Sequence, residues 1–260
     1  MEINLDKIKT WLLEYSESLL GDPEIDFLIR IKQRHSARVA GEMDNLTRQL
    51  RLSPQERALA LATAWLHDAG RFEQVVKYRK MFDYDTENHA LLGVRVIENS
   101  GIIKDLDAAA RKSILTAIAH HNKFTLNGSL NQKELLFCRL IRDADKLDIM
   151  DTILEIEASG DPELLDQVYL RLQEGQTPSP SALAQILAGK SVRDRDVRSR
   201  IDFRLLMMAW VYDLNFIPSF KAVKERKYLD TLAELLPPSE EVIKVCKIVK
   251  DYLERKLLEG

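Results

Sequence analysis

The sequence predicts an all-α protein. Apolar residues recur every three or four positions along nearly every long segment, no segment alternates polar and apolar residues as a half-buried strand does, and helix-ending glycines and prolines punctuate the chain. With 260 residues the chain is long enough to bury a sizeable core. Its 38 Lys and Arg against 41 Asp and Glu give a net charge of −3, which argues against a partner that is a nucleic-acid polymer.

The helices of the first part follow from periodicity and from end signals. Ser53 as N-cap, Pro54 at the first helical position and Glu56 three residues after the cap predict the start of one of them. The predicted helices cover about residues 5–20, 24–50, 53–69, 87–99, 107–121 and 132–158. Between them, residues 71–85 are predicted to form a polar, aromatic loop and residues 122–131 a second loop.

The rest of the chain is predicted to be more helix, broken at about residues 176–180 and at Pro237 and Pro238. The segment 193–200 alternates in charge and is interpreted as a solvated helix face. We therefore expect a core with an N-terminal helix over residues 1–158 and a helical extension over residues 159–260, packed on the core as one globular unit.

Several features favour a cytoplasmic protein. The two cysteines, Cys138 and Cys246, form no CxxC pair, so neither a disulfide framework nor a thiolate metal site is expected. The first fifteen residues carry charges through their apolar run, as an amphipathic helix does and a signal peptide does not. The longest uncharged apolar stretches, 58–66 and 205–212, are too short to span a bilayer, so no membrane partner is expected.

Six ionisable residues fall on the apolar faces of five predicted helices. His35, for example, shares a face with Ile31 and Val39. The six residues are His35, His67, Asp68, His89, His121 and Asp145. One histidine on such a face is most simply a hydrogen-bonded core residue, but an unpaired buried carboxylate is rare. Burying six such groups is costly unless they are paired or bound to a metal, so the set predicts a shared metal site.

The order of these residues resembles the H…HD…D pattern of the HD superfamily. His35 supplies the first element, His67 and Asp68 the second, and Asp145 the third. Four segments resemble further family motifs: LHDAGRFEQ (66–74), NHALLG (88–93), AIAHHNK (117–123) and IRDADKLD (141–148). The resemblance covers about residues 30–150 and implies an HD-domain helical bundle, here with a C-terminal helical extension that carries no further motif.

The resemblance also implies a ligand set. In it, His35, His67, Asp68 and Asp145 hold one divalent ion, while His89 and His121, with Asp68 bridging, hold a second; the alternative is that only the first site is filled. His121 is preferred to His120 because it extends the stripe of Ile114, Ala117 and Ile118. Mixed imidazole and carboxylate ligands favour Mn, Fe, Co, Ni or Zn over Ca or Mg alone, with one or two ions per chain.

The implied chemistry is hydrolysis by a metal-activated water, whose pKa the metal lowers toward ~7. We assign catalytic roles to Asp68, His121 and Arg71. Substrate phosphate is expected to contact Arg71, Lys123, His120 and Lys146. Lys77 and Arg79 are more simply surface cations. Glu73 and Gln74 are candidate partners for a ligand imidazole.

The predicted function is that of a metal-dependent phosphohydrolase or phosphodiesterase acting on a small phosphorylated substrate, a nucleotide ester. No GYP tripeptide follows His121, which argues against a cyclic-di-GMP phosphodiesterase of the HD-GYP type. Two alternatives remain open: a di-iron oxygenase resembling the inositol-oxygenase-like HD proteins, and a non-catalytic HD binding module. The sequence predicts neither the metal nor the oligomeric state.

Overall fold

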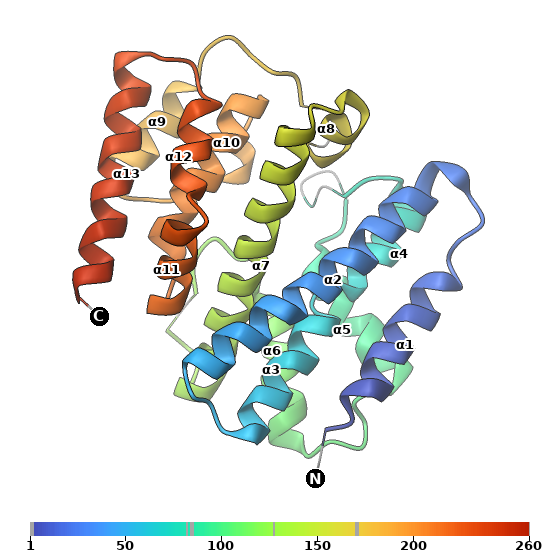
Figure 1. Ribbon diagram of the computed structural model, residues 1–260. Helices are drawn as coiled ribbons and strands as arrows, with labels where there is room; N and C mark the ends of the chain where they lie inside the picture. Colours follow the sequence, from blue (N-terminus) through green and yellow to red (C-terminus); the bar gives the residue numbers. More distant parts are fainter. Residues whose placement is uncertain (1–2, 82, 84–85, 127, 170–171, 260) are drawn as a thin grey trace. The chain divides into compact units, whose positions relative to one another are not determined.

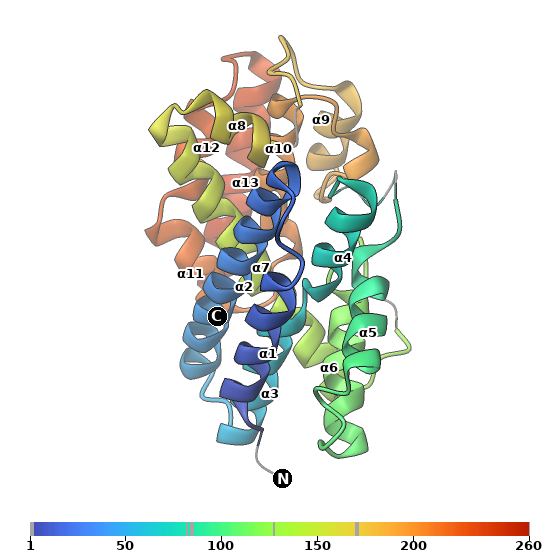
Figure 2. The same cartoon turned by 90° about the vertical axis from the view of Figure 1, so that its right-hand side faces the viewer.

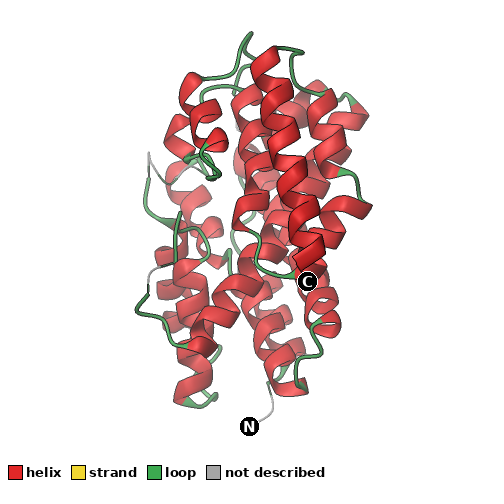
Figure 3. Cartoon of the chain, turned by 90° about the vertical axis from the view of Figure 1, so that its left-hand side faces the viewer, coloured by secondary structure: helices red, strands yellow, loops and turns green. Residues whose placement is uncertain are grey.

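The computed structural model describes residues 3–81, 83, 86–126, 128–169 and 172–259. These residues form thirteen α-helices and two short 3₁₀ helices, η1 and η2, with no strand among them (Figure 3). The prediction of an all-α fold is therefore confirmed.

The helix bounds divide into those before and those after residue 160. The first group is α1 (Leu5–Glu17), α2 (Pro23–Gln49), α3 (Pro54–Leu66), α4 (Ala69–Tyr78), α5 (His89–Ser100), α6 (Ala108–His120) and α7 (Gln132–Ser159). The second group is α8 (Pro162–Val168), α9 (Pro180–Leu187), η1 (Asp194–Asp196), α10 (Arg200–Ala209), η2 (Trp210–Asp213), α11 (Ile217–Glu225), α12 (Tyr228–Glu234) and α13 (Glu240–Glu259).

The chain divides into two compact units, Met1–Asp145 and Lys146–Gly260. The division falls inside α7, whose first half belongs to the first unit and whose second half belongs to the second. The expected boundary at residue 158, and the packing of the extension on the core, stay predictions.

Six helices and the first half of α7 build the first unit. Within it α2 packs along α3, and α3 also contacts α1 and α6 (Figure 1). α5 lies between α4 and α6 and contacts both (Figure 2). The core is apolar and fully buried, with Ile29, Met43, Leu59, Leu66, Phe72, Ile97, Ile114, Phe137 and Ile141 among its members. His35 and His89 are among the buried residues of α2 and α5, as the sequence predicts.

The predicted start of α3 is confirmed, but its predicted end is not. Glu56 N donates to Ser53 Oγ over 3.3 Å and Ser53 N donates to Glu56 Oε2 over 3.0 Å, which is the expected capping box. The helix stops at Leu66 instead of about residue 69, and His67 is its C-cap. His67 and Asp68 consequently lie where the chain leaves a helix, so their side chains are not confined to one helical face.

The prediction of a loop over residues 71–85 is wrong for its first part. Residues 69–78 form α4, because Phe72 and Val75 lie three positions apart and give this short segment a buried face. The helix ends at Arg79, which takes the left-handed conformation with φ 53°. Residues 82, 84 and 85 of the predicted loop lie outside the described residues. α4 thus brings Gly70, Arg71 and Gln74 onto a fixed scaffold beside Asp68.

The second unit has its own core, with Leu205, Met207, Val211, Leu232, Val245 and Val249 fully buried. The prediction of a helix face over residues 193–200 is wrong: only η1 is helical before α10 begins at Arg200. Asp202 explains this, because its carboxylate accepts hydrogen bonds from Ser179 N and Arg198 N and so holds the preceding segment in a non-helical path.

None of the described helices combines the length and the apolar character needed to cross a membrane. Cys138 and Cys246 are both buried free thiols, and burial raises the pKa of Cys138 to about 11.

Candidate metal centre

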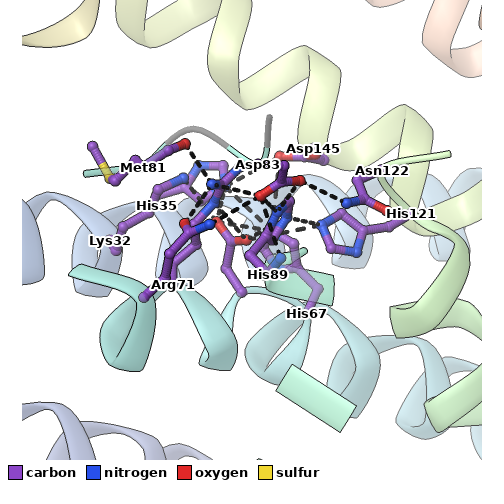
Figure 4. A network of polar contacts seen from close by, with 12 residues as sticks. Lys32, His35, His67, Arg71, Met81, Asp83, His89, His121, Asn122 and Asp145 are labelled. Atoms are coloured by element: carbon purple, nitrogen blue, oxygen red, sulfur yellow. Dashed lines mark hydrogen bonds and ion pairs between the residues drawn. The ribbon is translucent and has the colours of Figure 1, made fainter. Parts of the chain in front are cut away.

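Five elements of the first unit bring six side chains together (Figure 4). α2 contributes His35, the end of α3 contributes His67 and Asp68, α5 begins with His89, α6 ends beside His121, and α7 contributes Asp145. We call these six residues the His–Asp cluster. All but Asp145 are buried to 5% exposure or less. Five buried ionisable groups in contact form a site, not a set of separately satisfied core residues.

One half of the cluster is built around His35. Its Nε2 lies 3.2 Å from Nε2 of His67 and 3.1 Å from Oδ1 of Asp145. Oδ2 of Asp68 lies 3.5 Å from the same His35 nitrogen and 3.7 Å from that of His67. Four ligand atoms from two helices, α2 and α7, and from the end of α3 therefore surround a common point.

The other half is built around His89 and His121, whose Nε2 atoms lie 2.9 Å apart. Oδ1 of Asp68 lies 3.4 Å from the first of these nitrogens and 3.8 Å from the second. The two carboxylate oxygens of Asp68 thus face different histidine pairs, as a carboxylate bridging two ions would.

Hydrogen bonds made by the Nδ1 atoms, on the other side of each ring from the cluster, determine which nitrogen of these imidazoles carries a proton. Nδ1 of His67 bonds the carbonyl of Ala64 over 2.8 Å, and Nδ1 of His121 bonds the carbonyl of Ile118 over 2.7 Å. A carbonyl oxygen only accepts, so each Nδ1 carries a proton, and each Nε2 presents a lone pair to the cluster when the ring is neutral. Nδ1 of His89 is bonded to a carboxylate, Asp83, with the same consequence.

This arrangement fits a bound cation. The lone pairs of His89 and His121, which face each other at 2.9 Å, cannot bond one another, and the Nε2 atoms of His35 and His67 approach to 3.2 Å. A cation between them satisfies both, and two nitrogens held at ~2.0–2.1 Å by one ion lie about 2.8–3.4 Å apart for ligand angles between about 90° and 109°. The donor set of four imidazoles and two carboxylates suits a divalent transition metal.

The protonation states also suit metal binding. Burial lowers the pKa of His121 to about 3, and burial together with Arg71 lowers the pKa of His89. Burial opposes ionisation of Asp68, but Lys32, His67 and His89 outweigh it and hold the pKa of Asp68 well below its usual range. The ligand atoms of His121, His89 and Asp68 are thus already deprotonated near neutral pH, so they bind a metal ion without first releasing a proton. His67 differs, because burial opposes its protonation but Asp68 and Asp145 outweigh burial and raise its pKa.

The HD domain family matches residues 33–150 of the chain, a span that contains the whole His–Asp cluster. Residues 33–150 form an HD domain. HD domains bind divalent metals and are typically metal-dependent phosphohydrolases. Searches of curated proteins and of solved structures gave no match. The ligand roles of the individual residues stay predictions, supported by the geometry above.

One end of the Arg71 guanidinium in the HD domain is engaged in hydrogen bonds to neighbouring protein groups. Its Nη1 donates to Gln74 Oε1 over 2.7 Å, to the carbonyl of Met81 over 2.5 Å and to Asp83 Oδ1 over 3.3 Å. Its buried Nε has no hydrogen-bond partner among the described residues and lies 3.8 Å from Oδ1 of Asp68. Nε is thus placed beside Asp68, and the predicted catalytic and substrate roles of Arg71 stay predictions.

The other predicted substrate contacts lie outside the cluster. Lys123 is exposed, and Nδ1 of the half-buried His120 bonds the carbonyl of Thr116 over 2.9 Å. Lys146 belongs to the second unit, where its ammonium lies 2.7 Å from Asp213. Their contacts with substrate stay predictions. Lys77 and Arg79 behave as surface cations: each is exposed and pairs with nearby carboxylates.

Lys32 is a component of the site that the sequence analysis missed. Its ammonium lies 2.7 Å from Oδ2 of Asp68 and is only 16% exposed. The signal in the sequence is its spacing, because Lys32 stands three residues before His35 and therefore shares a helix face with it. Lys32 places a positive charge at the edge of the cluster, next to the carboxylate that both histidine pairs share.

Arg142 is a second missed residue, and it fixes the end of α6. It is buried and donates through Nη1 to the carbonyls of His121, over 3.0 Å, and of Lys123. A guanidinium at a helix C-terminus satisfies carbonyls that the helix leaves free and complements its dipole. Arg142 therefore holds the backbone that presents His121.

The neutral histidines predict how the chelator-treated protein responds to acid. The unfolded chain protonates His121 near pH 6.5, whereas burial delays this to about pH 3 in the folded protein. Between these values the unfolded chain binds one more proton at His121 than the folded chain does. The free energy of unfolding therefore decreases as the pH is lowered, by up to about 1.4 kcal/mol per pH unit for this group. His89 acts in the same direction; the raised pKa of His67 acts only above pH 6.5.

Urea unfolding in EDTA at about pH 6 and about pH 4.5 measures this effect. We expect the wild type to lose stability at the lower pH, and His121→Gln to lose less. Equal losses in the two proteins would show that His121 does not stay neutral in the fold.

Proposed function

We propose that this protein is a metal-dependent phosphohydrolase or phosphodiesterase that cleaves a phosphate ester of a small molecule, with nucleotides as the first candidates. The observation that carries the proposal is the pairing of Nε2 atoms, His35 with His67 and His89 with His121, with the two oxygens of Asp68 divided between the pairs. This geometry supports two ions bridged by one carboxylate.

A divalent ion bound in this cluster supplies a hydroxide nucleophile at neutral pH and polarises a phosphoryl oxygen. The chain's own residues position the ligand atoms and neutralise the charge of the substrate phosphate. Asp68 presents one carboxylate oxygen to each histidine pair, and Asp145 closes the half built around His35. Lys32 and the free Nε of Arg71 lie on either side of Asp68, where they can attract the negative charge of a phosphate group.

The proposal is tested on purified protein, first by metal analysis and then by activity. We expect up to two ions per chain, and phosphate or phosphomonoester release from at least one member of a panel of nucleoside mono-, di- and triphosphates, cyclic nucleotides and simple phosphate esters in Mn²⁺, Co²⁺ or Zn²⁺. EDTA should abolish the activity and the metal should restore it.

Two outcomes would overturn the proposal. Iron absorption with oxygen uptake on an organic substrate would show an oxygenase instead. Tight nucleotide binding without turnover in any metal would show a binding module.

A further inference from the structure

The ligand histidines differ in the helix end on which they lie. His67 and His121 are the C-caps of α3 and α6, and each Nδ1 bonds a carbonyl three residues earlier in its own helix. The last turn of a helix leaves such carbonyls free. His89 is instead the first residue of α5, where the free backbone groups are N–H donors. Its Nδ1 finds no acceptor in its own helix and needs one from elsewhere.

Asp83 provides that acceptor, six residues before His89. Nδ1 of His89 lies 2.8 Å from Oδ1 and 2.7 Å from Oδ2 of Asp83. The backbone N–H of His89 also donates to Oδ1, over 3.2 Å. The carboxylate therefore serves the ring and the start of the helix at once, and a negative charge at a helix N-terminus is stabilising.

Asp83 is itself held from two further elements (Figure 4). Gln74 Nε2 of α4 donates to it over 3.0 Å, as does Arg71 Nη1 over 3.3 Å. Asn122, which follows His121, donates over 2.9 Å through Nδ2. Gln74, predicted as a direct partner of an imidazole, thus reaches His89 only through Asp83. With donors on several sides, this carboxylate has one well-defined orientation.

We propose that Asp83 is the positioning residue of the half of the metal centre that contains His89: it keeps the proton on Nδ1 and turns the Nε2 lone pair toward His121 and Asp68. The inference rests on the proposed function, because it takes His89 as a metal ligand. Carboxylates that bond the outer nitrogen of a ligand imidazole orient the ring and increase its basicity. Asp83 is thereby coupled to metal binding, since displacing its carboxylate removes the acceptor of the His89 Nδ1 proton.

The first test reads the histidine directly. In chelator-treated, ¹⁵N-labelled protein, nitrogen chemical shifts distinguish an imidazole protonated on Nδ1 from one protonated on Nε2. We expect His89 to carry its proton on Nδ1 in the wild type and to move toward the Nε2 form in Asp83→Ala. An unchanged tautomer in a folded Asp83→Ala protein would overturn the proposal.

The second test measures metal affinity with Co²⁺, followed by its visible absorption and by equilibrium dialysis. Loss of a carboxylate behind a ligand imidazole typically weakens metal binding by roughly 10–100-fold. We expect Asp83→Ala to weaken one class of Co²⁺ site by about this factor, as His89→Ala does more severely, and Asp83→Glu to recover part of the affinity. Affinities within twofold of the wild type at every site would overturn the proposal.

Glu87→Gln is the matched control. It removes a carboxylate four residues after Asp83. The Glu87 side chain pairs with Lys77 and Arg95 and makes no described contact with the side chain of His89. Both its Co²⁺ affinity and its His89 tautomer should equal those of the wild type. The experiment is independent of turnover: if Co²⁺ binding depends on Asp83 but no phosphate ester is cleaved, the proposed function fails and the positioning role stands. If esters are cleaved while Asp83→Ala binds Co²⁺ normally, the reverse holds.

Discussion

Asp68→Ala is expected to abolish metal binding and hydrolysis together, with activity falling by roughly 10³-fold or more. Asp68 is the only described carboxylate with an oxygen facing each histidine pair, so its removal weakens both halves of the centre. A bound metal contributes several kcal/mol of transition-state stabilisation, and about 4 kcal/mol corresponds to 10³ in rate. Metal analysis and the initial rate on the best substrate of the panel measure the two effects.

Two companion variants interpret the result. Asp68→Asn keeps the shape of the side chain and removes its charge, so we expect nearly the same loss. Asp105→Asn removes an exposed carboxylate that pairs only with Lys7 among the described residues, and should keep full metal content and activity. Circular dichroism should show that most helix remains in all three. If Asp68→Ala kept its metal, the carboxylate would not be a ligand and the bridging geometry would have another cause.

Gly70→Ala is expected to destabilise the first unit by roughly 3 kcal/mol or more. A Cβ at Gly70 would lie 2.2 Å from the carbonyl oxygen of His89 and 2.3 Å from the backbone nitrogen of Gly93. Both obstacles are backbone atoms, so the added methyl group can be accommodated only if α4 and α5 move apart. Overpacking typically costs 1–3 kcal/mol, and backbone obstacles lie at or beyond the upper end. Urea unfolding measures the change.

Gly41→Ala is the matched control, because Gly41 also lies within a helix but its Cβ would have no atom within 4 Å. Alanine in an open helical position stabilises by roughly 0.5–1 kcal/mol, so the two glycine variants should shift in opposite directions. Because the obstacle at Gly70 is the backbone of His89, we also expect Gly70→Ala to weaken Co²⁺ binding in the same class of site as Asp83→Ala. Equal stability of the two variants would show that α4 and α5 can separate at little cost.

The sequence predicts those features that depend only on residues close together in the chain, such as helix caps and helix faces. The capping box at Ser53 needs only residues three apart, and the stripes that carry His35 and His121 need only helical periodicity, so both were readable. α4 was missed because ten residues provide few turns for a period to show and because Gly70 looks like the end of the preceding helix. The three-dimensional reason for Gly70, the close approach of α5, has no counterpart in a local pattern.

The candidate site was predicted unevenly for the same reason. The six members of the His–Asp cluster lie in or next to helices, where buried position can be inferred from spacing. Asp83 lies in a connecting segment without periodicity, and its contact with His89 depends on how α4, α5 and the chain after α6 pack. Asn88 as the N-cap, in place of the predicted start at about residue 87, makes His89 the first residue of its helix, and a ring at that position lacks an acceptor in its own helix. Lys123 and Lys146 were chosen only because each stands next to a motif residue in sequence; Lys123 is exposed and Lys146 pairs with Asp213, and their contacts with substrate stay predictions.

The opposed Nε2 lone pairs have a consequence for the abundance of this protein in a cell. A fold that brings such atoms together favours whichever cation is present, so each tenfold rise in free metal above the dissociation constant adds about 1.4 kcal/mol to the stability of the folded chain. For a marginally stable domain that increment changes the unfolded fraction tenfold, and it is the unfolded fraction that proteases remove. Metal supply would then set the steady-state abundance of the protein as well as its activity, with starvation lowering both at once.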